Sequence, residues 1–452
     1  MNKKNKANCY QTRISSCASE IAPHSLSTSI TANHHPIHRW FNFVAGFSPE
    51  FVDKCIFESD MDEKSCIIDP FAGCGTTMVE ANIQGIPSIG FEAHYFLANI
   101  CRSKLLFDID ISFIEEIRQE LCKINPQEDL ISRYPVAARS FLEKVIPECS
   151  LSVLVTARDK IGAYRGEKFE MAYLILSRVL DLCSHSKTDG IYKAPSSKKK
   201  AIEYDDAIEY MCDIISEDLN FMQNNKIANK AKLFPQSSED MSCLKPHICD
   251  LLVTSPPYLN NFDYAEMTRM HLYFWLHASN WSEISQKIRS KLIVNTTTAL
   301  KGHKDKIDLY RSNTPKCTHE ILDQYMAILS QKRKIKPGKK EYDYLIYPYF
   351  YQITNVLKCS NLVLRNNAPA HIIISDAAFY GTHIKTQEIL AAIMEDIGFV
   401  NISIKKLRDR GSRWILDKRE GTQEGLGEYQ ITGYADHTKE VNDVRNLQKF
   451  AL

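Results

Sequence analysis

Apolar and polar positions follow a strand-then-helix order in the first third of the chain. Short apolar runs over residues 66–69 and 88–92 are each followed by helical spacing, over 76–84 and 95–105. This order favours a parallel sheet with helices on its faces. A further apolar run over 250–254 resumes the strand pattern much later. The chain is therefore expected to form an α/β fold whose strands come from two distant segments.

Between these segments, residues 110–231 have mostly helical spacing, most clearly over 171–182 and 207–219. A basic, loop-like stretch over 187–200 separates the two helical patterns. The whole segment is predicted to be a helical insertion.

The last part of the chain returns to alternating elements. A polar, lysine-rich segment over 295–340 is read as a second, basic insertion. After it the pattern predicts two helices and three strands, over 349–358, 370–375, 386–394, 400–407 and 428–432. The predicted division is a loose N-terminal arm (1–31), a first catalytic part (32–109), the helical insertion (110–231), a second catalytic part (232–440) and a tail (441–452).

Composition narrows the class of protein without naming a partner. The chain has 452 residues, 44% hydrophobic and 25% charged, which is ordinary for a soluble globular protein. A net charge of +1 gives no global support for nucleic-acid binding, although it leaves room for a local basic cleft.

The cysteines and histidines favour reduced thiols over a metal site. The 14 cysteines lie singly, with no C-x-x-C pair, which fits the cytoplasm better than a disulfide framework. His34, His35 and His38 lack partners at ligand spacing, so no metal is expected. No apolar run is long enough to span a membrane, so no membrane association is expected.

The first candidate site is the turn after the run at 66–69. Asp69 ends the strand, and Gly73 and Gly75 can adopt the positive φ that lets a backbone approach a ligand closely. Thr76 and Thr77 can cap the following helix. No lysine occupies the position that a phosphate-binding loop requires, which argues against ATP. An ordinary glycine turn is the alternative.

Glu92 ends the second predicted strand. An acidic side chain at this place can accept hydrogen bonds from both ribose hydroxyls of a nucleoside. Without the glycine turn, a solvated charge at a strand end would be the simpler interpretation.

The second candidate site follows the run at 250–254. Pro256 and Pro257 cannot donate to a sheet, so they force the chain out of the strand. The Ser255 hydroxyl and the Pro256 carbonyl are then free to accept hydrogens from an exocyclic amine. The ring of Tyr258 can stack on a base, a contact worth roughly 1–3 kcal/mol. The alternative is a proline turn with a packed tyrosine.

Together the two sites resemble the signature motifs of a known family. The run Asp-Pro-Phe-Ala-Gly-Cys-Gly-Thr-Thr at 69–77 and the run Thr-Ser-Pro-Pro-Tyr at 254–258 resemble those of amino-group DNA methyltransferases that use S-adenosylmethionine. The resemblance covers roughly 33–105 and 233–433. It implies a Rossmann-like methyltransferase fold with a mostly parallel central sheet, S-adenosylmethionine as cofactor and double-stranded DNA as partner. The target base would be flipped out of the helix.

The resemblance also implies roles for individual residues. Ser255, Pro256, Pro257 and Tyr258 would form the catalytic loop. The cofactor would be bound by residues from four short segments: Phe43, Ala45, Asp69, Phe71, Ala72, Gly73, Gly75, Thr76, Thr77, Glu92, Ser238 and Asp240.

Three further assignments leave alternatives open. Either Ser238 or Asp240 could meet the cofactor adenine. Asp263 and Tyr264 either line the pocket for the base or form a helix cap and a core aromatic. The arginines within 408–414 either meet phosphates or belong to a solvated loop.

The reaction implied is in-line attack of the amine on the sulfonium methyl, which needs positioning and no covalent cysteine adduct. A serine before the two prolines is, in the family, more typical of cytosine N4 methylation than of adenine N6 methylation. An amine methyltransferase acting on RNA and a non-catalytic nucleic-acid binder are the other candidates. Target recognition is hypothesised to lie within 110–230. The recognised site, the oligomeric state and the presence of a cognate restriction endonuclease are left open.

Overall fold

The structure is a computed structural model that describes residues 28, 31–41, 43, 45–127, 129–189, 192–194, 199–259, 262–335, 340–410 and 425–438. Most of the predicted N-terminal arm, residues 411–414 of the arginine-containing loop and the predicted tail lie outside these ranges.

The core of the fold is one seven-stranded sheet with the order β10-β11-β7-β6-β1-β2-β5. Strands β5, β2, β1, β6 and β7 are parallel, and β11 is antiparallel to both of its neighbours. The predicted mostly parallel sheet is therefore confirmed. The bounds are β1 Ile67–Asp69, β2 Ser88–Phe91, β5 Ala231–Phe234, β6 Leu251–Thr254, β7 Pro369–Ser375, β10 Phe399–Asp409 and β11 Gly427–Ala435.

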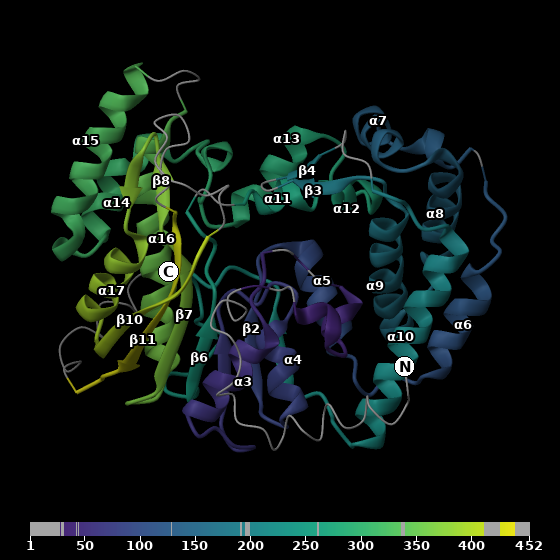
Figure 1. The fold of residues 1–452 in the computed structure, drawn as a ribbon, viewed down its shortest axis with the longest axis horizontal. Helices are drawn as coiled ribbons and strands as arrows, with labels where there is room; N and C mark the ends of the chain where they lie inside the picture. The colour runs from purple at the N-terminus through teal and green to yellow at the C-terminus, as the bar shows by residue number, and fades with distance from the viewer. Residues whose placement is uncertain are drawn as a thin grey trace.

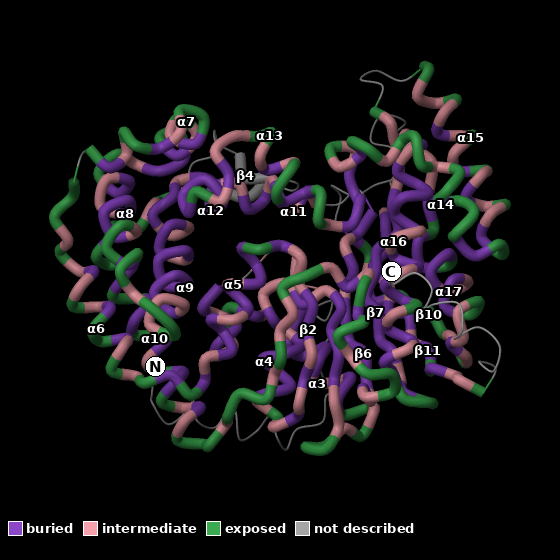
Figure 2. Tube along the Cα trace, turned by 180° about the vertical axis from the view of Figure 1, so that it is seen from behind, coloured by how far each residue is buried: buried purple, intermediate pink, exposed green. Residues whose placement is uncertain are grey.

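The central strands are apolar because both sheet faces are covered. Every residue of β1 and β6 is buried, as expected for parallel strands between helical layers. The covering helices include α3 Pro49–Glu58, α4 Thr76–Ile83, α5 Tyr95–Lys104, α16 Ile346–Val363 and α17 Thr386–Asp396. Figure 2 shows the buried strands β6 and β7 and the buried side of α16 within this layered part.

The predicted start of the helix over 349–358 was wrong. Helix α16 begins at Ile346, so Pro348 lies in its first turn and not ahead of the helix. Proline is tolerated there because the first-turn N–H groups have no partner within the helix.

A group of helices stands beside the sheet, next to α5 (Figure 1). These are α6 Ser112–Leu121, α7 Val136–Val145, α8 Glu148–Ile161, α9 Gly166–Cys183 and α10 Tyr204–Asn224. Helix α9 lies among α5, α6, α8 and α10, and ten of its residues are buried. The predicted loop at 187–200 instead contains a short hairpin, β3 Lys187–Asp189 and β4 Tyr192–Ala194.

The lysine-rich segment at 295–340 contains the helices α14 Ile307–Asn313 and α15 His319–Ile335. Leu322, Tyr325 and Leu329 form a buried stripe on α15, at spacings of three and four residues. Three further short helices follow the second motif, α11 Tyr264–Met267, α12 Arg269–Phe274 and α13 Trp281–Glu283, and a hairpin follows β7, β8 Ala377–Phe379 and β9 Thr382–Ile384. Among the described residues, no helix combines the length and the apolar character needed to cross a membrane.

Candidate functional site

The two motifs lie at the ends of neighbouring strands. Ile67 pairs with Leu251 and Ile68 with Leu252, so β1 and β6 run side by side and end at the same edge. After β1 the chain continues to β2, which lies on one side of β1 within the sheet, and it later returns to form β6 on the other side of β1. Such a topological switch point is where α/β folds usually bind their ligands.

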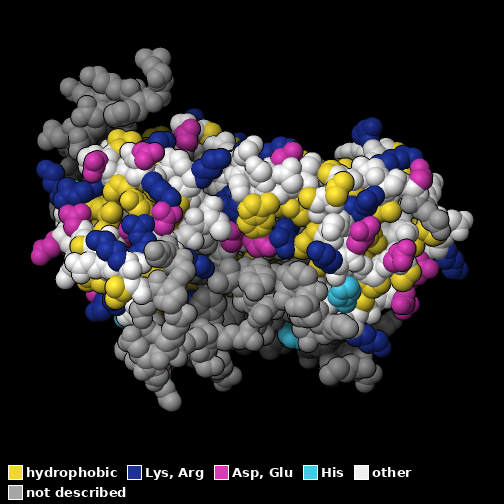
Figure 3. All heavy atoms as spheres, turned by 90° about the horizontal axis from the view of Figure 1, so that it is seen from above, with side chains coloured by type: hydrophobic (Ala, Val, Ile, Leu, Met, Phe, Trp, Pro, Cys, Tyr) yellow, Lys and Arg dark blue, Asp and Glu magenta, His cyan; other side chains and the backbone are white. Residues whose placement is uncertain are grey.

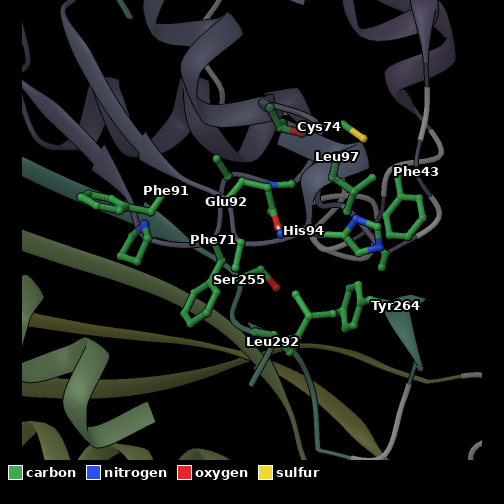
Figure 4. Close-up of a pocket in the computed structure, with 18 of the residues that line it drawn as sticks. Phe43, Phe71, Cys74, Phe91, Glu92, His94, Leu97, Ser255, Tyr264 and Leu292 are labelled. Carbon is green, nitrogen blue, oxygen red and sulfur yellow. Dashed lines mark hydrogen bonds between the residues drawn. The ribbon is translucent and has the colours of Figure 1, made fainter. Parts of the chain in front are cut away.

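A cavity opens at this edge and contains about 1030 Å³ of empty space, part of it open to solvent. Figure 4 shows side chains from the glycine turn, from the end of β2 and from the loop after β6 around it. The predicted site residues that line it are Phe43, Ala45, Phe71, Ala72, Gly73, Thr76, Glu92, Ser238, Ser255, Pro257 and Tyr264. The cavity therefore joins parts of both motifs.

The two glycines of the first motif have different surroundings. Both have positive φ, +54° at Gly73 and +86° at Gly75. A Cβ on Gly75 would lie 2.7 Å from the Cys101 Sγ, whereas one on Gly73 would meet nothing closer than 4.0 Å. Gly75 thus allows tight packing of α4 against α5, and Gly73 leaves backbone open toward the cavity.

Glu92 connects the end of β2 to the glycine turn. Its Oε2 accepts a hydrogen bond of 2.8 Å from the Gly73 N–H, and its Oε1 accepts one of 2.7 Å from the His94 N–H. Each carboxylate oxygen has a second lone pair for another donor. Burial raises the pKa of Glu92 to about 7, against the effect of the two backbone hydrogen bonds.

Asp69 and Thr77 lie behind the cavity. Asp69 is fully buried, and its Oδ1 accepts hydrogen bonds from the Thr254 hydroxyl (2.6 Å) and the Phe71 N–H (3.0 Å). Burial raises the pKa of Asp69 to about 6. Thr77 donates a hydrogen bond of 3.4 Å to the Val253 carbonyl. These side chains, like Gly75, hold the shape of the turn and do not line the cavity.

The Ser-Pro-Pro-Tyr loop contributes Ser255 and Pro257 to the cavity, while Pro256 and Tyr258 lie outside it. The Pro257 carbonyl accepts a hydrogen bond of 2.9 Å from the Tyr349 hydroxyl, which fixes the loop. The Tyr258 side chain is buried, with the Arg410 guanidinium 5.9 Å from its ring centre. Figure 4 shows Ser255 among Phe71, Leu292 and Tyr264.

Asp263 and Tyr264, adjacent in sequence, take different places. The Asp263 carboxylate accepts a hydrogen bond of 3.1 Å from the Glu266 N–H, which caps α11. It also pairs with the buried Arg289 at 2.9 Å and accepts a hydrogen bond of 2.7 Å from Thr298. Asp263 therefore takes the position of a helix cap outside the cavity. Tyr264 lines the cavity, and its ring centre lies 6.2 Å from that of Phe43.

The two residues proposed to contact the cofactor adenine, Ser238 and Asp240, also lie in different surroundings. Ser238 is buried and lines the cavity. Asp240 is exposed, and its Oδ1 accepts a hydrogen bond of 2.9 Å from the Ser242 N–H. Hydrogen bonding from the Ser242 side chain, and then from this N–H, lowers the pKa of Asp240. Of the two, only Ser238 is placed to meet a ligand in the cavity.

Several cavity residues were not anticipated from the sequence. His94 and Leu97 come from the start of α5, and Leu292 from the segment after α13. Lys104 is buried and donates hydrogen bonds to the carbonyls of His38 (3.2 Å) and Phe41 (2.6 Å). No sequence signal pointed to Lys104, because its partners lie more than sixty residues away.

Among the described residues, no group of three or more His, Cys, Asp or Glu side chains could hold a metal ion.

Comparisons with known proteins give distant relatives. No protein-family model matches the chain. The chain is 23% identical over 390 residues to the Type II methyltransferase M.AvaI of Nostoc sp. (strain PCC 7120), covering 80% of this chain and 79% of that protein. The protein of the same name from Anabaena variabilis gives the same values. The Type II methyltransferase M.BsoBI of Geobacillus stearothermophilus is 23% identical over 413 residues, which cover 83% and 81% of the two chains.

The strand order, the cavity at the switch point and these relatives define a Rossmann-like methyltransferase fold. The chain resembles Type II methyltransferases along most of its length.

Proposed function

We propose that this protein is a site-specific DNA methyltransferase that uses S-adenosylmethionine and methylates an exocyclic amine. One observation carries the proposal: the glycine turn with Glu92 and the loop with Ser255 face the same cavity. The names of the relatives, which are Type II methyltransferases, agree with it.

The residues of the cavity fit S-adenosylmethionine. The free lone pairs of the Glu92 carboxylate suit the two ribose hydroxyls. The open backbone at Gly73 leaves room for the amino-acid part of the cofactor, which a side chain would occupy. Phe43, Ala45, Phe71, Ala72 and Thr76 complete the walls, and Ser238 meets the adenine. Asp69, Gly75 and Thr77 support the turn from behind. When bound, the cofactor supplies a methyl group activated by the positive sulfonium.

Ser255 is the acceptor that meets the target amine, because its side chain lies on the cavity wall. As the N–C bond forms and the C–S bond breaks, a hydrogen bond from the amine to the Ser255 hydroxyl oxygen stabilises the positive charge that develops on nitrogen, and the amine then loses one proton. Tyr264 offers its ring to the base. Of the other proposed catalytic residues, Pro257 also lines the cavity, whereas Pro256 and Tyr258 lie outside it in this conformation and support the loop that carries Ser255.

Cytosine N4 in double-stranded DNA is the proposed target, on the basis of the serine before the two prolines. Adenine N6 is the alternative. Residues 110–231, including α6 to α10, are proposed to recognise the DNA site, within a restriction-modification system of the cytoplasm. The face seen from above in Figure 3 shows Lys and Arg mixed with Asp and Glu over its described part. A local set of basic residues would therefore meet the phosphates.

Nucleoside analysis tests the proposal. Double-stranded DNA and, separately, RNA are incubated with the protein and S-adenosylmethionine carrying an isotopically labelled methyl group, then digested and examined by mass spectrometry. Labelled N4-methyldeoxycytidine is the expected product. Labelled N6-methyldeoxyadenosine would retain the DNA methyltransferase and replace its target. Label found only in RNA, or cofactor binding without transfer to any nucleic acid, would overturn the proposal.

A further inference from the structure

His94 is a buried cavity residue that the proposed mechanism does not use. It follows Glu92 by two residues, immediately before α5, and only 1% of its surface is exposed. His94 is one of the residues that line the cavity, and Figure 4 shows its side chain near Glu92, Phe43 and Tyr264.

A neighbouring hydroxyl fixes which ring nitrogen carries the proton. The His94 Nε2 lies 2.8 Å from the Thr268 Oγ1. The same hydroxyl is directed at the carbonyls of Tyr264 (2.9 Å) and Ala265 (3.2 Å). A carbonyl can only accept, so we assign the single Thr268 proton to the helix carbonyls, which leaves the hydroxyl oxygen to accept from His94. The proton therefore belongs on Nε2.

The other ring nitrogen is then a buried acceptor. Burial lowers the pKa of His94 to about 3, so the ring is neutral near pH 7 and Nδ1 carries a lone pair. Nδ1 is buried and has no hydrogen-bond partner among the described residues. A buried polar atom without a partner is unusual in a folded protein and is often relieved by a bound group.

We propose that His94 binds the methyl donor directly, with Nδ1 accepting a hydrogen bond from an O–H or N–H group of that cofactor. The inference rests on the proposed function and adds a residue that neither motif contains. We assign the donor to the cofactor and not to the target base because the His94 backbone N–H donates a hydrogen bond to Glu92, the residue proposed to hold the ribose. A ribose hydroxyl and the ammonium of the amino-acid part are the two donors of matching chemistry.

Two substitutions of His94 test the roles of its two ring nitrogens independently. His94→Asn keeps an acceptor near the position of Nδ1, and His94→Gln keeps a donor toward Thr268 without that acceptor. His271→Gln is the matched control, since His271 is also buried but does not line the cavity. Affinity for S-adenosylhomocysteine is measured by titration calorimetry, with thermal melting of each variant as a check on folding.

His94→Gln is expected to weaken S-adenosylhomocysteine binding about tenfold to a hundredfold, which corresponds to the loss of one buried hydrogen bond. His94→Asn should retain affinity within a few-fold of the wild type, and His271→Gln should leave it unchanged. 5′-Methylthioadenosine, which lacks the amino-acid part, identifies the donor. If its affinity also falls in His94→Gln, the donor is a ribose hydroxyl; if only S-adenosylhomocysteine is affected, it is the ammonium.

Equal S-adenosylhomocysteine affinity in the wild type and His94→Gln would overturn the role of His94 while leaving the proposed function intact. If S-adenosylhomocysteine affinity is unchanged in His94→Gln but turnover on DNA falls, the proposed role is also overturned, because His94 would then act on the target base and not on the cofactor. A wild type that binds no S-adenosylhomocysteine would contradict the proposed function and this inference together.

Discussion

The Thr254 hydroxyl donates a hydrogen bond of 2.6 Å to the fully buried carboxylate of Asp69. This contact joins the last residues of β1 and β6, which are 185 positions apart in sequence. The glycine turn begins immediately after one strand and the Ser-Pro-Pro-Tyr loop immediately after the other. The hydrogen bond therefore holds the two halves of the proposed active site at a fixed separation.

Ser255→Ala removes the proposed acceptor for the target amine. Methyl transfer should fall by roughly a hundredfold to ten-thousandfold, the usual range for a group that handles a proton in the transition state. Cofactor affinity should stay within a few-fold of the wild type, because Ser255 belongs to the loop after β6 and not to the glycine turn. Single-turnover rates and calorimetry measure the two quantities. Unchanged turnover would remove Ser255 from the mechanism.

The two glycines of the first motif should respond differently to alanine. In Gly75→Ala the new Cβ meets the Cys101 Sγ at 2.7 Å in a left-handed backbone, so both stability and cofactor binding should fall. Gly73→Ala has the same backbone strain, about 1–2 kcal/mol, without the clash. Its melting temperature should fall less, while cofactor affinity is lost because the methyl group enters the cavity. Equal melting temperatures in the two variants would contradict this difference.

Cofactor binding should depend on the protonation of Glu92. The ionised carboxylate accepts from both ribose hydroxyls, and burial raises its pKa to about 7. Affinity should therefore rise between pH 6 and pH 8 in the wild type, and this part of the rise should disappear in Glu92→Gln. Calorimetric titration with S-adenosylhomocysteine at several pH values measures the affinity of both proteins. Protonation of the ligand affects both proteins equally, so the difference between them reports on Glu92.

The same pKa predicts an effect on stability with a definite sign. The pKa of Glu92 is raised from its ordinary 4.5, so the folded protein holds the proton more tightly than the unfolded chain does. The stabilisation that protonated Glu92 contributes to the free energy of unfolding is complete below about pH 4.5 and is lost as the pH rises to about 7. Chemical denaturation should show that this loss is absent in Glu92→Gln; an identical pH profile in both would contradict it.

Asp263→Asn tests the position of that carboxylate outside the cavity. Asp263 and Arg289 form a buried ion pair, with 8% and 4% of their side chains exposed. Removing one charge leaves the other buried and unpaired, which should cost about 3–5 kcal/mol of unfolding free energy. Lys287→Gln, which breaks an exposed pair with Glu283, should cost less than about 1 kcal/mol. If Asp263→Asn stayed as stable as Lys287→Gln, the ion pair would not be structural.

The sheet was predictable where strands are buried on both faces. β1 and β6 are short, continuous apolar runs, and such runs are typical of parallel strands between helical layers. β5 was missed because its sequence, Ala-Lys-Leu-Phe, lies at the sheet edge with no residue fully buried. The buried stripe of α15 was missed because the segment was judged by its many lysines, which within α15 lie only in the basic last turn.

The cavity residues proposed from the sequence belong to short segments that each carry a recognisable local pattern. Gly73 and Ser255 belong to local turns whose shape depends on neighbouring glycines or prolines. His94 depends on Thr268, which is 174 positions away, and Asp263 on Arg289 in a segment that gave no signal of its own. Their partners are set by tertiary packing, which a single sequence does not display.

The most direct test of the central claim is a crystal structure of the protein with S-adenosylhomocysteine. The account predicts that the ribose hydroxyls lie on the Glu92 carboxylate and that the sulfur faces the Ser255 hydroxyl across the cavity. A ligand bound elsewhere, or one whose sulfur points away from the loop after β6, would contradict the account.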